Sequence, residues 1–248
     1  MVSGGLVKVL LQPVVELPTG RIVGYEALSR GPEGTPLESP EALYGMGRKQ
    51  SLLFSLERLC RRKALLAKSR FFPSGLYLFL NVDPQVVYEA RHQADITREV
   101  VVSLGLKPEE IVLELTERTA IPDYKSFVHA LELYRRHGFL IALDDVGSGH
   151  SNLRSIAEIK PHFLKVDMSL VRGINEDGAK RAVVEAVAAL AEKIDARVIA
   201  EGVESPEELF TLFSVGVRLA QGYFLARPEE TPPSLCPQAR AALSELAR

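Results

Sequence analysis

Short apolar segments alternate with longer amphipathic segments along most of the chain. Several apolar segments are almost continuously hydrophobic, which is typical of strands buried on both faces of a parallel sheet. The pattern predicts strands over residues 6–11, 22–28, 76–82, 111–115, 140–143, 163–166, 197–200 and 217–220.

Helical periodicity fills most of the intervals between these strands. Gly138 follows one such segment and predicts its end, because glycine favours the position just after a helix. The predicted helices cover residues 51–68, 94–104, 123–137, 151–158, 178–194 and 206–214.

Strands that alternate with helices over a whole chain predict a parallel sheet, and about eight of them suggest closure into an α/β (β/α)8 TIM-like barrel. Pro18, Thr19 and Gly20 separate the first two strands by a short turn, so one early strand pair is expected to be antiparallel. The alternative is an open doubly wound sheet, but no G-x-G-x-x-G turn follows the first strand.

The length of 248 residues suits one barrel domain over residues 1–248. Its core is expected over about residues 6–228, and the Pro-rich stretch that follows is expected to be a tail or packing helix over 229–248. The net charge of −2 argues against partners such as a DNA or RNA polymer or an anionic membrane.

Nothing in the sequence predicts export or membrane insertion. No apolar run reaches the ~18 residues that span a bilayer, and the first residues carry no signal-peptide pattern. Cys60 and Cys236 lie far apart and form no C-x-x-C motif. We therefore expect a cytoplasmic protein with two ordinary thiols.

Carboxylates and amides occupy the carboxyl ends of the predicted strands, which in a parallel barrel all open on the face that carries active sites. Any one of them alone would be unremarkable: Asp144-Asp145 could be a turn, Lys165 a surface lysine and Asn81 a turn former. Their shared position favours one site. The strand-end residues are Glu26, Asn81, Glu114, Asp144, Asp145, Lys165, Asp167, Glu201 and Gln221.

Converging carboxylates require compensation, since two like charges repel by ~4 kcal/mol at 4 Å and an effective dielectric constant of 20. Divalent cations provide it, and oxygen ligands with one amide suit Mg²⁺ or Mn²⁺. The five histidines show no zinc-like spacing. The sequence therefore predicts a metal site built from hard oxygen ligands.

Ordered motifs over about residues 6–228 resemble those of EAL domains, which are bacterial cyclic di-GMP phosphodiesterases. The signature Glu26-Ala27-Leu28 is followed by matches to the E-x-T-E, D-D-F-G-x-G, K-x-D, E-G-V-E and Q-G-Y motifs, and Gln12-Pro13 resembles the start of the family's first strand. In chain order, these matches lie at residues 12–15, 26–28, 114–117, 144–149, 165–167, 201–204 and 221–223.

The resemblance implies two metal ions and a role for each matched residue. Glu26, Asn81, Glu114 and Asp144 would hold the first ion, and Asp144, Asp145 and Asp167 the second, directly or through water. Lys165, supported by Glu201, would orient or help to deprotonate the attacking water. The residues implied to act outside the metal ligands are Gln12 and Arg30 on phosphate and guanine, Gln221 near the metal-bound water, and Glu117 as an anchor of the loop after Asp145.

The implied reaction is in-line hydrolysis of cyclic di-GMP to linear pGpG, with a ribose 3′-oxygen as the leaving group. The resemblance also implies a homodimer. Val146 and His150 replace the family's usual Phe and Tyr, and Ser29 and Gly31 replace Leu and Trp. None of these changes removes a ligand, but the two loop changes bear on dimer coupling.

Three other functions stay open at this point. A catalytically inactive cyclic di-GMP receptor would bind without cleaving, although such relatives usually lack one or more of the acids kept here. A partner-docking barrel would need no strand-end acids, and a hydrolase of another phosphodiester would share the barrel. The sequence shows no sensor or cyclase domain, which leaves room for a separate regulatory partner.

Overall fold

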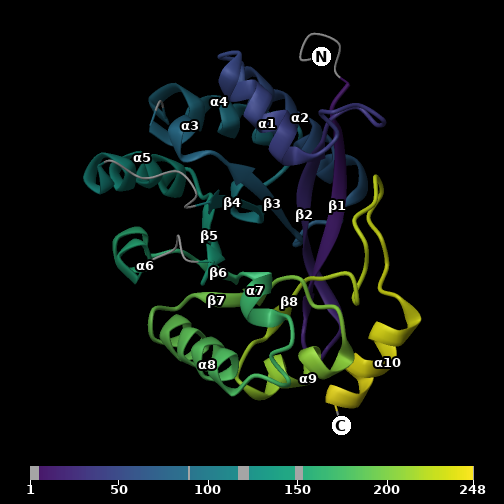
Figure 1. The fold of residues 1–248 in the computed structure, drawn as a ribbon. Helices are drawn as coiled ribbons and strands as arrows, with labels where there is room; N and C mark the ends of the chain where they lie inside the picture. Colours follow the sequence, from purple (N-terminus) through teal and green to yellow (C-terminus); the bar gives the residue numbers. More distant parts are fainter. Residues whose placement is uncertain (1–5, 89, 117–122, 149–152, 248) are drawn as a thin grey trace.

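Eight strands form a closed barrel in the computed structural model, which describes residues 6–88, 90–116, 123–148 and 153–247 (Figure 1). Neighbouring strands in the sequence are also neighbours in the barrel, and β8 closes onto β1. The strands are β1 (Lys8–Glu16), β2 (Arg21–Arg30), β3 (Tyr77–Val82), β4 (Ile111–Thr116), β5 (Leu140–Val146), β6 (Phe163–Val166), β7 (Arg197–Ala200) and β8 (Leu219–Ala220).

The first strand runs against its two neighbours. β1 is antiparallel to both β2 and β8, whereas the pairs from β2 to β8 are parallel. The tight turn between β1 and β2, with Gly20 in a left-handed conformation (φ 68°), permits this reversal. The predicted α/β barrel with one early antiparallel strand is thus confirmed.

Helices surround the barrel, and most lie where the sequence pattern predicts them. Three further helices, α1, α3 and α7, were not predicted. Helices α3 and α7 have only five and four residues, too few to show a helical periodicity, whereas α1 has ten and was missed although Leu43 and Gly47 on it are buried. In order, the helices are α1 (Pro40–Lys49), α2 (Leu53–Phe71), α3 (Pro84–Tyr88), α4 (Ala90–Ser103), α5 (Tyr124–Arg136), α6 (Leu153–Ile159), α7 (Met168–Val171), α8 (Gly178–Lys193), α9 (Pro206–Ser214) and α10 (Pro237–Leu246). None of the described helices is long and apolar enough to cross a bilayer.

A small apolar cluster is formed by inward-facing side chains of the strands, separate from the larger core that includes the helices. Phe79 and Phe163 meet edge to face in it, with ring centroids 5.3 Å apart. Such a layer makes a barrel interior a packed core and not a pore. The cluster comprises Val14, Val23, Phe79, Val112, Ala142, Phe163, Ile199 and Leu219.

The predicted tail returns to the barrel. Glu229 and Leu11 exchange two backbone hydrogen bonds, of 2.7 and 3.1 Å, beside β1. Farther on, the N–H of Cys236 donates to the carbonyl of Leu225, and α10 begins directly after this contact. The chain beyond residue 228 therefore covers part of the seam between β1 and β8.

His162, just before β6, gives the fold a predicted pH dependence. Its Nδ1 accepts the N–H of Ile141 at 3.0 Å. Burial, followed by the charge of Arg135, lowers the pKa of His162 below its ordinary value. The native state therefore binds this proton less tightly than the unfolded chain, so stability is lost as the pH falls through the range below about 6.5.

His162→Asn should keep an acceptor for Ile141 but remove the titrating ring. We expect the unfolding free energy of the variant to fall less than that of the wild type between about pH 7 and pH 5. Urea unfolding at a series of pH values measures it. Parallel curves for the two proteins would show that His162 does not contribute.

Candidate active site at the barrel mouth

The site residues lie one layer above the apolar cluster. Side chains two positions apart in a strand share a face, so a residue two positions beyond a cluster member also points into the barrel. Six strands follow this rule, with the pairs Phe79–Asn81, Val112–Glu114, Ala142–Asp144, Phe163–Lys165, Ile199–Glu201 and Leu219–Gln221. The register of the strands therefore places these polar side chains around the mouth.

Lys165 occupies the centre of the acidic side chains. Its side chain is 1% exposed, and four carboxylates within or directly after four other strands surround its ammonium group. The distances from Nζ are 2.7 Å to Glu201 Oε1, 2.8 Å to Glu114 Oε1, and 3.4 Å to both Glu26 Oε2 and Asp144 Oδ1. The structure thus brings together residues from five strands that the sequence assigns to one site.

Asp144 and Asp145 are neighbours in the sequence, yet both are buried at the mouth. The pairing of β5 with β6 shifts register between Leu143 and Val146, and Asp145 adopts a left-handed conformation with φ 57°. This irregularity breaks the alternation that would otherwise send adjacent side chains to opposite faces. Oxygen atoms of Asp144, Asp145 and Glu201 all lie within 4.8 Å of one another.

Glu26 is held by amides from both sides of the mouth. Asn81 Nδ2 donates to its Oε1 at 2.9 Å, and Gln221 Nε2 donates to its Oε2 at 2.7 Å. Gln221 Nε2 also reaches Gln12 Oε1 at 2.9 Å. Gln12 is the cross-strand partner of Glu26, so the reversed direction of β1 adds an amide to the wall of the site.

The loops after β7 and β8 are locked together beside these residues. A Cβ atom on Gly222 would lie 2.2 Å from the carbonyl oxygen of Val203, so only glycine fits there. Val203 N–H donates to the carbonyl of Gln221 at 3.1 Å, and Phe224 N–H donates to the carbonyl of Val203 at 3.0 Å. The loop that follows Glu201 is thereby fixed to the loop that follows Gln221.

Burial and mutual repulsion disturb the acid–base equilibria of this cluster. Burial raises the pKa of Glu114 and of Glu201 well above the usual value, and nearby carboxylates add to the effect. The pKa of Asp144 is raised for the same reasons. For Glu26 the effect of burial is outweighed by Lys165, Gln221 and Asn81, so its pKa is lowered.

The pKa of Lys165 is affected by burial, which lowers it, and by four carboxylates, which raise it. The carboxylates dominate, and the pKa lies well above its ordinary value. Lys165 is therefore an ammonium ion that offsets one of the negative charges at the mouth.

The donor set fits divalent cations. Four carboxylates, from Glu26, Glu114, Asp144 and Glu201, surround the ammonium group of Lys165, and a fifth, from Asp145, lies beside those of Asp144 and Glu201. Within the part of the chain that the structure describes, Glu114 Oε2 and Gln221 Oε1 are buried without a hydrogen-bonding partner. Buried oxygens of this kind are normally satisfied, so these two point to ligands or water that the protein alone does not provide.

Other predicted site residues lie at or outside the edge of this cluster. Asp167 caps α7 by accepting the N–H of Ser169 at 2.9 Å and is not among the three clustered metal-type ligands. Arg30, at the end of β2, donates to the carbonyl of Ser29 at 2.9 Å. Glu117, predicted to anchor the loop, and His150 lie outside the described residues.

Glu201 has a position that the sequence did not assign. We predicted it as a support for Lys165, and the structure places it next to Lys165 and also within reach of Asp144 and Asp145. The i,i+2 spacing from the apolar Ile199 could have indicated the inward direction. The distance to the two aspartates could not be read from the sequence, because it depends on the irregularity in β5.

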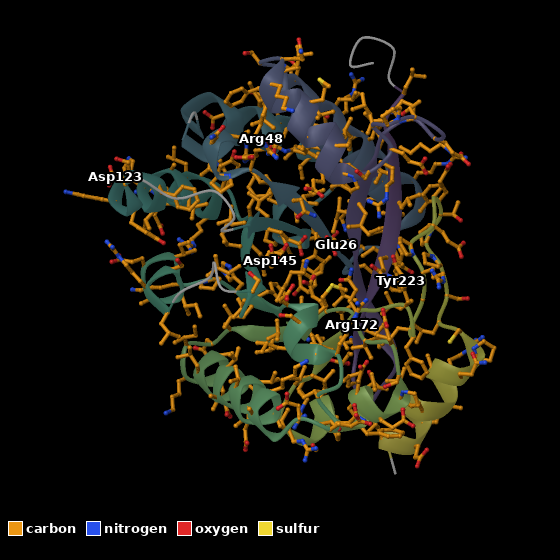
Figure 2. The ribbon with its side chains drawn as sticks, viewed as in Figure 1. Glu26, Arg48, Asp123, Asp145, Arg172 and Tyr223 are labelled. Atoms are coloured by element: carbon orange, nitrogen blue, oxygen red, sulfur yellow. The ribbon has the colours of Figure 1, made fainter. Side chains whose placement is uncertain are left out.

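The closed α/β barrel makes this protein a TIM-barrel protein. The carboxylates at its strand ends, around a buried lysine, form a mouth that suits divalent cations (Figure 2, where Glu26 and Asp145 are labelled). Residues 1–228 match the family described as "EAL domain". The chain belongs to this family, as the sequence motifs predicted.

Two relatives from Escherichia coli are named as probable cyclic di-GMP phosphodiesterases. "Probable cyclic di-GMP phosphodiesterase PdeN" of Escherichia coli K12 is 31% identical over 231 residues, which cover 89% of this chain and 43% of PdeN. The chain therefore spans less than half of the length of that relative.

Two solved structures share the fold. Klebsiella pneumoniae BlrP1, in a complex with calcium and cyclic di-GMP, has a TM-score of 0.86 and 30% identity, with 94% of this chain and 58% of BlrP1 covered. A standalone EAL protein from Vibrio cholerae O395, bound to cyclic di-GMP, has a TM-score of 0.84 and 31% identity, with 94% and 97% covered.

Proposed function

We propose that the protein is a metal-dependent phosphodiesterase that hydrolyses cyclic di-GMP to linear pGpG. The observation that carries the proposal is the convergence of Glu26, Glu114, Asp144 and Glu201 on Lys165 at the barrel mouth. The choice of cyclic di-GMP as the substrate is supported by the family and by the relatives whose structures contain cyclic di-GMP. The unpartnered oxygens of Glu114 and Gln221 support the requirement for cations.

Each residue of the mouth has a role in this proposal. Bound Mg²⁺ or Mn²⁺, in two sites, would act as a Lewis acid on a phosphate oxygen and lower the pKa of water. Glu26, Asn81, Glu114 and Asp144 would hold one ion. Asp144, Asp145 and, directly or through water, Asp167 would hold the other.

The remaining residues act on the substrate and on the water. Lys165 orients the attacking water, and the adjacent Glu201 takes up a proton. Attack on phosphorus in line with the ribose 3′-oxygen breaks that P–O bond, and the 3′-oxygen gains a proton as pGpG forms. Gln12 and Arg30 would contact guanine and phosphate, Gln221 would lie near the metal-bound water, and Glu117 would anchor the loop after Asp145.

A turnover assay tests the function directly. Cyclic di-GMP should be converted to pGpG with added Mg²⁺ or Mn²⁺ and should persist when EDTA replaces the metal, with pGpG quantified by chromatography. Other cyclic and linear phosphodiesters serve as the comparison panel. Binding of cyclic di-GMP without any pGpG would instead assign a receptor, and preferential cleavage of another diester would overturn the substrate.

Several features that accompany this proposal rest on the sequence alone. The homodimer, the single domain over residues 1–248, the cytoplasmic location and a separate regulatory partner stay predictions. Val146 is buried at the end of β5, so its side chain faces the interior and does not form part of an exposed loop surface.

A further inference from the structure

Helix α2 contacts both ends of strand β3 through buried charged side chains. Just before the N-terminal end of β3, Lys68 Nζ donates to the carbonyl of Leu76. The same ammonium group pairs with Glu110 Oε2 at 2.9 Å. The same carboxylate accepts the N–H of Gly75 through Oε1 at 2.8 Å. These bonds hold the residues that lead into β3, far from the barrel mouth.

Glu57 makes the corresponding contact at the C-terminal end of β3, which is the end at the barrel mouth. Its Oε1 accepts the N–H of Asp83 at 2.7 Å, and its Oε2 lies 3.3 Å from Arg61, four residues along the helix. Asp83 follows the last residue of β3, so its N–H lies beyond the strand ladder. Arg48 on α1 also pairs with Asp83 at 3.1 Å, and Figure 2 labels Arg48 higher in the view than Glu26.

Keeping a carboxylate at residue 57 has an energetic cost. Its side chain is 3% exposed, and burial raises the pKa of Glu57 to about 7 in spite of Arg61 and the Asp83 N–H. A carboxylate that is hard to ionise contributes little net stability as an ion pair. Its position suggests another use, because the turn that it holds lies two residues after Asn81, which contacts Glu26 at 2.9 Å.

We propose that Glu57 is a positioning residue that fixes the end of β3 and thereby holds Asn81 in the geometry needed to bind the metal ion with Glu26. The inference rests on the proposed function, since it concerns the same metal site. The hydrogen-bonding partners described for Glu57 are Arg61 and the N–H of Asp83, not the side chains proposed as metal ligands. It acts through the backbone between Asn81 and Asp83, where a shift of the turn would move the amide oxygen away from the other ligands.

Three variants separate positioning from ordinary stabilisation. Glu57→Ala removes the acceptor for Asp83, Glu57→Gln retains an acceptor oxygen, and Lys68→Met is the matched control that disturbs the other end of β3 from the same helix. Mn²⁺ affinity is measured by electron paramagnetic resonance without substrate, thermal unfolding is recorded in parallel, and the Mn²⁺ dependence of pGpG formation is followed.

Glu57→Ala should weaken Mn²⁺ binding by about 10-fold, the size typical of outer-shell partners of metal ligands. Glu57→Gln should restore most of the affinity. Lys68→Met should lower the melting temperature but bind Mn²⁺ like the wild type. Should Glu57→Ala not fold, Glu57→Ser carries the same expectation, because its hydroxyl is too short to reach Asp83.

The opposite pattern would overturn the inference. Wild-type Mn²⁺ affinity in a folded Glu57→Ala or Glu57→Ser protein would show that Glu57 only stabilises the fold, as would an equal loss in Lys68→Met. A wild-type protein that binds Mn²⁺ but forms no pGpG would contradict the proposed hydrolysis and leave the proposed role of Glu57 standing. A wild-type protein that binds no Mn²⁺ would defeat both.

Discussion

Asp144→Asn is expected to reduce cyclic di-GMP hydrolysis by at least about a thousandfold, or ~4 kcal/mol of transition-state stabilisation. Asp144 is the residue proposed to contact both metal ions, and it lies 3.4 Å from Lys165. Asparagine has almost the same shape but lacks the negative charge that both ions require. The fold should survive, because the substitution removes one member of a mutually repelling set of acids.

The rate of pGpG formation under saturating Mn²⁺ measures this effect, with circular dichroism to verify folding. Asp177→Asn is a matched control, since Asp177 caps α8 by accepting the N–H groups of Ala179 and Lys180. Asparagine caps a helix about as well as aspartate, so this control should retain full activity. Turnover of Asp144→Asn above about a tenth of the wild-type value would refute the site assignment.

Lys165→Met is expected to destabilise the metal-free protein by about 3–5 kcal/mol, the usual cost of removing one partner from a buried ion pair. Glu114 is fully buried and Glu26 nearly so, and the substitution takes away the ammonium group that pairs with both. Hydrolysis should be lost as well. Urea unfolding in EDTA measures the first effect, and pGpG formation measures the second.

Added Mn²⁺ should recover a larger share of stability in Lys165→Met than in the wild type, because cations would then be the main compensation for the acids. The double variant Lys165→Met/Glu114→Gln should be more stable than Lys165→Met alone, since one buried charge is removed with the lysine. A loss below about 1 kcal/mol in EDTA would show that the carboxylates tolerate the change by taking up protons.

The sequence predicted the barrel because the strands are nearly continuous apolar runs, a signal that does not depend on tertiary contacts. It also predicted that strand-end polar residues would lie together, because a polar residue interrupts or directly follows most of these runs, as Glu114 and Lys165 do. It missed α7, a single helical turn whose start depends on Asp167. Asp167 caps this turn, a local contact that the sequence prediction of Asp167 as a metal ligand did not include.

The features that the sequence did not predict depend on contacts between residues far apart in the chain. The left-handed conformation of Asp145 depends on the pairing of β5 with β6, and the residues next to Asp145 in the sequence do not predict it. Glu57 was not singled out, because its partner Asp83 is 26 residues away and contributes a backbone N–H, which any residue there would offer, to the Glu57 carboxylate. Contacts of this kind leave no pattern in a single sequence.

The return of the chain to β1 has a practical consequence for protein engineering. Along β1, strand β8 pairs with Val15 and Glu16, and Glu229 satisfies backbone groups of Leu11 nearer the other end of β1. A fragment cut at Pro228, where the family match ends, would leave that stretch of β1 with open hydrogen-bonding groups. Exposed strand edges recruit other chains, so such a shortened protein would be prone to aggregate during purification.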